Sequence, residues 1–361
     1  REEIPLRPGD VVITNHPAFG GSHLPDITLL AGSYTEAGQL IGYVANRAHH
    51  AEIGGKTPGS MPADATSIVE EGVVIRPQYL VENGKVQWDA MEALFTGAAY
   101  PTRALAENLA DLNGALAAIR YGVKALEELV DTLGYSDVQT AMHSVREHGR
   151  KRLVAALQNR SGGPWAAQDT LDDGSAIQVS ITQPSPEKLV IDFSGTGDQH
   201  PGNLNANRAI VNSVVLYVLR LMINEPLPLN EGLLEPIDII LPDGSLVHPY
   251  FGPDDQRNPA VVGGNTEVSQ RLTNLMLRAL GMSAASQGTM NNTLFGNDNF
   301  GYYETVGGGT GGSPLGAGAH AVHHHMTNTR ITDPEILEWR YPVRLERWAV
   351  RTNTGGAGKH P

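Results

Sequence analysis

The feature that most constrains the fold of this chain is a set of apolar residues that recur at spacings of three and four. The set comprises Leu105, Leu109, Leu112, Leu116, Ile119, Val123, Leu126 and Val130. This spacing places the apolar side chains on one face of a helix, and Gly134 is a suitable C-terminal stop. Residues 89–160 are therefore predicted to form two or three antiparallel helices.

The segments on either side of these helices have strand patterns. In residues 1–88, short apolar runs at 11–14, 27–31, 40–45, 73–75 and 79–81 alternate with turn signals, and residues 82–85 resemble a hairpin turn. In residues 161–361, strands are expected at 176–181, 188–193 and 237–241, helices at 206–223 and 268–280, and Gly-rich loops between them.

The order of these elements predicts the fold class. Strands and helices come in blocks rather than alternating singly, which favours an α+β fold over a doubly wound sheet. We expect three parts: a strand-rich segment at 1–88 that carries a metal site, a helical segment at 89–160, and a mixed α/β segment at 161–361 that completes the site.

Composition narrows the classes of partner. The 361 residues carry a formal net charge of -13 and no basic cluster beyond Arg150, Lys151 and Arg152, so neither nucleic acid nor an anionic membrane is an expected partner. No signal peptide or membrane span is visible, which favours a cytoplasmic protein that acts on a small molecule. Because the chain has no cysteine, any metal must be held by histidines and carboxylates.

The two ends indicate a piece of a longer polypeptide. The chain begins with Arg1 and enters a turn and a strand almost at once, and it stops in a Gly-rich stretch at residues 355–361. We expect a fragment of a larger domain.

The first candidate site combines His23 and Asp26 with His49 and His50. Neutral imidazoles and a carboxylate suit a divalent cation, and three such ligands leave positions open for water and substrate. Neighbouring residues point apart, so His49 is the expected ligand, reached from a loop after the strand at 40–45. The alternative is that these are loop histidines satisfied by hydrogen bonds.

The second candidate is the segment at 263–271, which is expected to open the helix at 268–280. Backbone N–H groups at a helix start attract anions, so Gly264, Asn265, Gln270 and Arg271 are candidates for binding a carboxylate or phosphate. A glycine turn with an N-capping Asn or Thr is the alternative. The chain contains no Gly-x-x-x-x-Gly-Lys-Ser/Thr pattern, so it offers no recognised ATP site of its own.

The third candidate is the histidine-rich segment at 320–333. On a strand, His323 and His325 would share one face and could ligate a metal or position a substrate. A polar edge strand with a solvated histidine face is the alternative.

Taken together, these segments resemble one family, the hydantoinase B/oxoprolinase proteins. The matching strings lie, in order, at residues 13–26, 46–55, 57–62, 108–112, 192–196, 263–271, 285–292, 301–305 and 325–335. The chain departs from the usual pattern after Asn15, where it has His16-Pro17-Ala18-Phe19, and at the string ending in Met326.

The resemblance implies a division of labour between two components. An A-type subunit or domain binds ATP and Mg and activates the substrate, and a B-type component finishes the reaction; 5-oxoprolinases open 5-oxoproline and N-methylhydantoinases open a related ring. It also implies a divalent metal (Zn, Mn or Mg) on His23, Asp26 and His49. On this basis we hypothesise that His50 or His325 transfers a proton and that Asn46 and Arg47 bind the anionic cyclic-amide substrate. The 263–271 segment would hold the anionic end of the substrate or the departing phosphate.

Two other functions stay open at this point. The similar acetone and acetophenone carboxylases use a B-like subunit in an ATP-dependent ketone carboxylation. The chain could also be a non-catalytic scaffold for an A-type partner, with the histidines in structural roles. In each case a homo-oligomer or hetero-oligomer is expected.

Overall fold

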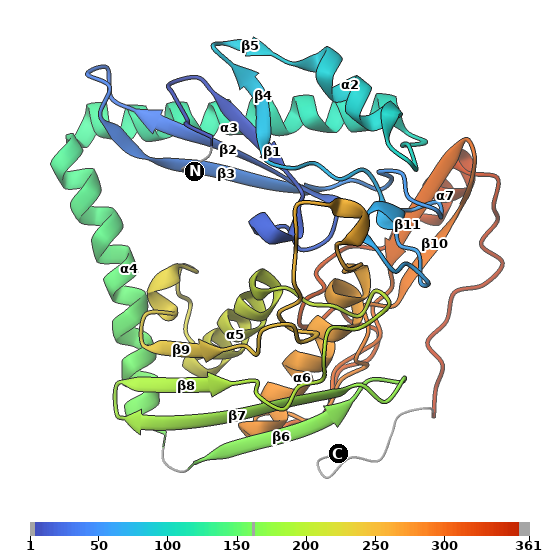
Figure 1. Ribbon diagram of the computed structural model, residues 1–361. Helices are drawn as coiled ribbons and strands as arrows, with labels where there is room; N and C mark the ends of the chain where they lie inside the picture. The colour runs from blue at the N-terminus through green and yellow to red at the C-terminus, as the bar shows by residue number, and fades with distance from the viewer. Residues whose placement is uncertain (1–3, 161–162, 354–361) are drawn as a thin grey trace.

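The computed structural model of the protein describes residues 4–160 and 163–353. These residues form two lobes, each built on a β-sheet with its own apolar core, and helix α4 (Tyr135–Gln158) runs from one lobe to the other (Figure 1). The predicted α+β class is confirmed. The Gly-rich stretch at 355–361, which we expected to be a loop, lies outside the described residues.

The first lobe is a five-stranded antiparallel sheet with the order β3-β2-β1-β4-β5. Its strands are β1 (Val11–Thr14), β2 (Asp26–Tyr34), β3 (Leu40–His49), β4 (Gln78–Glu82) and β5 (Lys85–Val86). The predicted hairpin turn is confirmed, because Glu82 lies opposite Lys85. Helices η1 (Pro17–Phe19), α1 (Ile68–Glu71) and α2 (Trp88–Gly97) belong to the same lobe.

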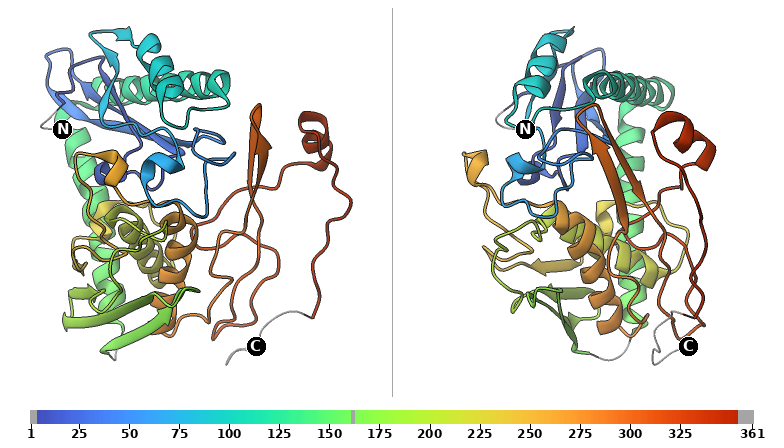
Figure 2. Two further views of the ribbon diagram at one scale, coloured as in Figure 1. Left: turned by 45° about the vertical axis from the view of Figure 1, so that its right-hand side comes forward. Right: turned by 90° about the vertical axis from the view of Figure 1, so that its right-hand side faces the viewer.

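The apolar periodicity at 105–130 forms helix α3 (Leu105–Leu133), which ends immediately before Gly134 as predicted. Its buried face, which includes Leu112, Leu116 and Ile119, packs on the first sheet over β2 and β3. The predicted antiparallel arrangement is wrong. Gly134 has a φ of +87°, and α4 leaves the end of α3 in a new direction instead of folding back along it (Figures 1 and 2).

Helix α4 therefore links two cores instead of completing one. Its last turns carry Leu153 and Leu157 into the second core, whereas the buried side chains of α3 belong to the first core. The helical segment expected at 89–160 is thus divided between the two lobes.

The second lobe is a four-stranded sheet with the order β6-β7-β8-β9, in which only β8 and β9 are parallel. Its main elements are β6 (Trp165–Thr170), β7 (Ala176–Ser185), β8 (Lys188–Asp192), α5 (Arg208–Ile223), β9 (Ile237–Ile240) and α6 (Ser269–Ala279), with the short helices η2 (Glu231–Leu233) and η4 (Gly264–Val268). The short helix η3 (Asp255–Arg257) packs against α1 of the first lobe. The predicted 176–181 and 188–193 strand pair and both predicted helices are confirmed within a few residues.

The last part of the described chain returns to the first lobe. Strands β10 (Asn292–Asn297) and β11 (Phe300–Thr305) form a hairpin, followed by a long extended stretch and helix α7 (Pro334–Arg340). Figure 1 shows the hairpin rising from the second lobe beside the first. Within the described part of the chain, every helix falls short of the length or apolarity that a membrane span requires.

A buried amide side chain ties the first sheet to the loops around it. Asn15, which follows β1 and is fully buried, donates from Nδ2 to the carbonyls of Leu24 (2.8 Å) and Val73 (2.9 Å). Its Oδ1 accepts from the N–H of Ile75 at 2.7 Å. The predicted strand at 73–75 is wrong: its backbone groups bond to the Asn15 side chain, to the Asn15 N–H and to the Ile53 carbonyl instead of forming a strand ladder.

Replacing Asn15 should therefore destabilise the whole first lobe. Asn15→Leu leaves two carbonyls and one N–H buried without partners, so we expect the free energy of unfolding to fall by about 2–5 kcal/mol in urea denaturation. Asn113→Leu, on the exposed face of α3, is the matched control and should change stability by roughly 0.5 kcal/mol or less. Equal effects of the two substitutions would contradict this account of Asn15.

Candidate metal centre

The register between β2 and β3 creates the candidate site. Asp26, the first residue of β2, lies directly opposite His49, the last residue of β3, and His23 sits in the turn before β2. Asp26 Oδ1 lies 3.2 Å from His49 Nδ1, and Asp26 Oδ2 lies 2.9 Å from His23 Nδ1. One potential ligand atom from each of the three residues lies within 4.8 Å of the others. We expected a loop to bring His49 across, but β3 itself extends to His49.

The surroundings of His23 fit a bound cation. His23 is 2% exposed, and neither of its ring nitrogens makes a hydrogen bond among the described residues. The short contact between its Nδ1 and Asp26 lacks the direction of a hydrogen bond, although the distance would allow one. A buried imidazole without partners is costly unless something else uses its lone pair, and a metal ion would do so.

The charge states of Asp26 and His49 also suit a metal. Burial works to raise the pKa of Asp26, but the two histidines outweigh it and hold the pKa well below its usual range. Burial lowers the pKa of His49, against the opposing effect of Asp26. At neutral pH the site therefore presents an ionised carboxylate and a neutral imidazole, which are the forms that bind metals.

Arg47 and Asn46, two further candidate residues on β3, lie on opposite faces of the sheet. Arg47 shares the face of His49, and its guanidinium donates to Thr28 Oγ1 (2.8 Å) and to the Gly20 carbonyl (2.7 Å). Asn46 points to the opposite face, where its Nδ2 donates to the Ala115 carbonyl of α3 at 2.7 Å. Alternation along a strand requires this division.

His50 is also directed toward α3. It is 1% exposed, its Nδ1 lies 3.1 Å from Asn108 Nδ2, and burial lowers its pKa. Its Nε2 is buried without a hydrogen-bond partner among the described residues.

His325 lies in a loop, and the strand predicted through His323 and His325 is wrong. The backbone N–H of His325 donates to the Tyr217 hydroxyl at 3.2 Å, and His325 has a φ of +53°, so the segment cannot continue as a strand. The His325 ring contacts the Tyr217 hydroxyl (3.3 Å) and Asn274 Oδ1 (3.1 Å). Burial lowers its pKa to about 3. No hydrogen bond or ring contact within residues 4–160 and 163–353 joins it to the His23, Asp26 and His49 group.

The segment at 263–271 opens the helical run that leads into α6, as we expected, and the run begins within one residue of the predicted start. Helical backbone begins at Val262, continues through the π-helical turn η4 and leads into α6. The N–H groups of Val261 and Val262 already donate to the buried Glu71 carboxylate at 2.8–3.0 Å. These amides are therefore not available to bind an anion.

The side chains of this segment have partners within the second lobe. A Cβ on Gly264 would lie 1.9 Å from the Asn205 carbonyl oxygen, so glycine permits close packing there. Asn265 lies half-buried inside the π turn. Gln270 Oε1 accepts from Met326 N at 3.2 Å, and Arg271 pairs with Asp172 at 2.7 Å.

Tyr303 of β11 is a neighbour of the site to which the sequence had assigned no role. Its ring centroid lies 4.6 Å from that of His49. The only signal in the sequence was its place in one of the strings that resemble the family, because nothing local indicates which distant strand end it contacts.

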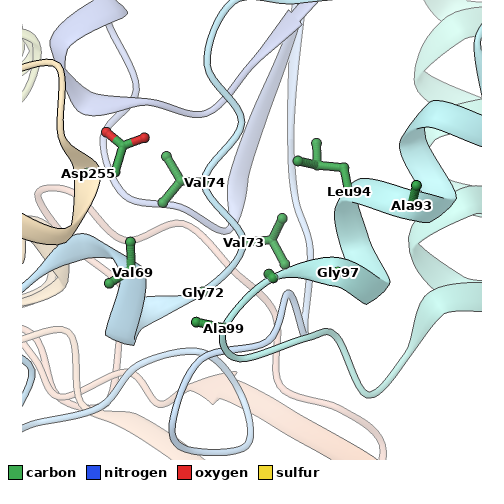
Figure 3. Close-up of a pocket in the computed structure, with 10 residues that line it drawn as sticks. Val69, Gly72, Val73, Val74, Ala93, Leu94, Gly97, Ala99 and Asp255 are labelled. Carbon is green, nitrogen blue, oxygen red and sulfur yellow. The ribbon is translucent and has the colours of Figure 1, made fainter.

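A separate pocket lies away from these residues. It encloses about 280 Å³ between α1, the segment after it and the end of α2, and it is mainly apolar (Figure 3). Its one carboxylate, Asp255, already binds Arg76 (2.6 Å) and His16 (3.0 Å). None of the predicted site residues lines this pocket.

Comparison with known proteins agrees with the resemblance in the sequence. The chain is 41% identical over 378 residues to 5-oxoprolinase 1 of Arabidopsis thaliana; the match covers 98% of this chain but 29% of that protein. The crystal structure of ATP-dependent caprolactamase from Pseudomonas jessenii superposes with a TM-score of 0.82 at 23% identity, covering 99% of this chain and 63% of that one.

Nucleotide-free acetone carboxylase superposes with a TM-score of 0.75 at 20% identity, covering 92% of this chain and 47% of that one. At these identities the two solved structures show that the fold is shared. The sequence profile of hydantoinase B/oxoprolinase matches residues 1–361. The chain therefore belongs to the hydantoinase B/oxoprolinase family.

Proposed function

We propose that this chain is the B-type component of an ATP-dependent cyclic-amide hydrolase, which opens 5-oxoproline or a hydantoin ring after an A-type partner has activated the substrate. The observation that carries the proposal is the convergence of His23, Asp26 and His49 in a chain 41% identical to a 5-oxoprolinase. Because the chain spans 29% of that relative and has no recognised ATP-binding pattern, ATP and Mg are assigned to the A-type partner, fused or separate.

The residues of the site have distinct roles in this proposal. His23, Asp26 and His49 would hold a divalent cation (Zn, Mn or Mg) that, when bound, supplies Lewis acidity and activates water. Three protein ligands leave coordination positions open. Arg47, on the same face as His49, is fixed by Thr28 and Gly20 and would attract the anionic end of the substrate.

The remaining assignments stay predictions. Proton transfer by His50 or His325, and substrate binding by Asn46, Gly264, Asn265, Gln270 and Arg271, involve residues whose described contacts run to α3 or within the second lobe.

Loss of a ligand should remove the metal. We expect wild-type protein to hold about one divalent ion per chain and Asp26→Asn or His49→Ala to hold almost none, because each removes one of three ligands. Elemental analysis measures this directly. His143→Ala, on the exposed face of α4, is the matched control and should keep the ion. Retention of the ion by both ligand variants would exclude this site, and a wild-type chain without metal would favour a scaffold role.

Reconstitution with an A-type partner tests the activity. We expect ATP-dependent release of glutamate from 5-oxoproline, or opening of a hydantoin, and a loss of at least about 100-fold with Asp26→Asn while His143→Ala stays near wild type. A parallel reaction with a ketone and bicarbonate is included because acetone carboxylase shares the fold. Consumption of bicarbonate without cyclic-amide opening would replace the hydrolase proposal with a carboxylase.

A further inference from the structure

We infer that Tyr303 is a positioning residue that holds the His49 imidazole in the orientation required for the metal. The inference rests on the proposed function, because it concerns the same metal. It is carried by three observations: the ring contact with His49, the anchoring of the Tyr303 hydroxyl, and the close seating of the β10–β11 hairpin on the loop after β3.

The imidazole of His49 is confined by its neighbours. The Tyr303 ring lies 4.6 Å away at an interplanar angle of 38°, and the His23 ring lies 5.3 Å away at 28°. The His49 side chain is 29% exposed at the end of the edge strand β3, where Asp26 and the His23 ring contact it from the first lobe. Without Tyr303, rotation about the His49 side-chain bonds would move Nδ1 away from Asp26.

The Tyr303 ring is itself held in place through its hydroxyl. Thr305 Oγ1 donates to Asn292 Oδ1 at 2.8 Å, so its single proton is committed there. The 2.6 Å contact between Tyr303 and Thr305 therefore has Tyr303 as the donor. Tyr303 and Thr305 are alternate residues of β11 and share a face, which makes this chain of hydrogen bonds part of the hairpin itself.

Two glycines bring this face of the hairpin close to the first lobe. A Cβ on Gly301 would lie 2.6 Å from Glu52 Oε2, and one on Gly296 would lie 2.6 Å from Pro58 Cβ. Glu52 cannot readily move aside, because it is 1% exposed and accepts from the N–H groups of Gly54 (2.6 Å) and Gly59 (2.8 Å). The close packing of the hairpin backbone against Glu52 and Pro58 thus sets the distance from Tyr303 to His49.

The opposite face of the hairpin provides an internal control. Tyr302, the neighbour of Tyr303, stacks on Phe295 at 4.7 Å and contacts Tyr341 at 5.0 Å. Its hydroxyl donates to Thr332 Oγ1 at 3.0 Å. The ring and hydroxyl contacts of Tyr302 thus lie on the face of the hairpin turned away from the metal ligands.

Cobalt binding by the full chain tests the inference without any assay of activity. We expect Tyr303→Leu to weaken Co²⁺ binding by about 10-fold or more and to change the visible spectrum of the bound ion, because a support of one ligand is lost. Tyr303→Phe keeps the ring contact but loses the hydroxyl bond to Thr305, so its affinity for Co²⁺ should lie between those of wild type and Tyr303→Leu. Tyr302→Leu, the same change on the other face, should leave affinity and spectrum unchanged.

A backbone variant tests the seating independently. Gly301→Ala should displace the hairpin from Glu52 and weaken Co²⁺ binding with Tyr303 intact, whereas Gly114→Ala, at an open position on α3, should not. If Tyr303→Leu binds Co²⁺ with the affinity and spectrum of wild type, the positioning role is overturned and the proposed function is not. The same holds if only the melting temperature of this variant falls. If Co²⁺ binding by the wild-type protein does not depend on Asp26, the proposed function is overturned as well.

Discussion

The antiparallel register between β2 and β3 is the constraint on which the candidate site depends. It places Asp26 opposite His49, and the turn before β2 then brings His23 to the other oxygen of the same carboxylate. A shift of one residue would turn either side chain to the opposite face of the sheet. The sheet therefore does more than support the site, because its strand pairing is what joins two ligands from different strands.

Buried polar side chains then fix the loops that strand pairing leaves free. Asn15 bonds the turn before β2 to the segment after α1, and Glu52 organises the loop after β3. Between the lobes, Asn207 caps α5 with one side-chain atom and donates to the carbonyl of Pro17 with another. Glu71 similarly receives the amides of Val261 and Val262. Each group is costly to bury without partners, so these loops are held in single conformations.

The two lobes contribute differently to the candidate metal site. The first lobe supplies all three proposed metal ligands, and the β10–β11 hairpin, which rises from the second lobe, supplies the Tyr303 ring that contacts one of them. The amides of Val261 and Val262, immediately before the 263–271 segment, serve the contact between the lobes. A site built in this way depends on both lobes even though only one carries the ligands.

The sequence by itself determined the local features. Spacing of apolar residues predicted α3 and its end at Gly134, and short apolar runs bounded by turn signals predicted most strands. The absence of cysteine directed attention to His23, Asp26 and His49. The predictions of helices and strands succeed because the patterns behind them act over a few residues, whereas the metal site stays a prediction. Only the tertiary structure decided the direction of α4, the loss of the 73–75 strand, the loop at His325 and the place of Tyr303. Each of these depends on which distant group accepts a hydrogen bond or fills a contact, and no local pattern records that choice.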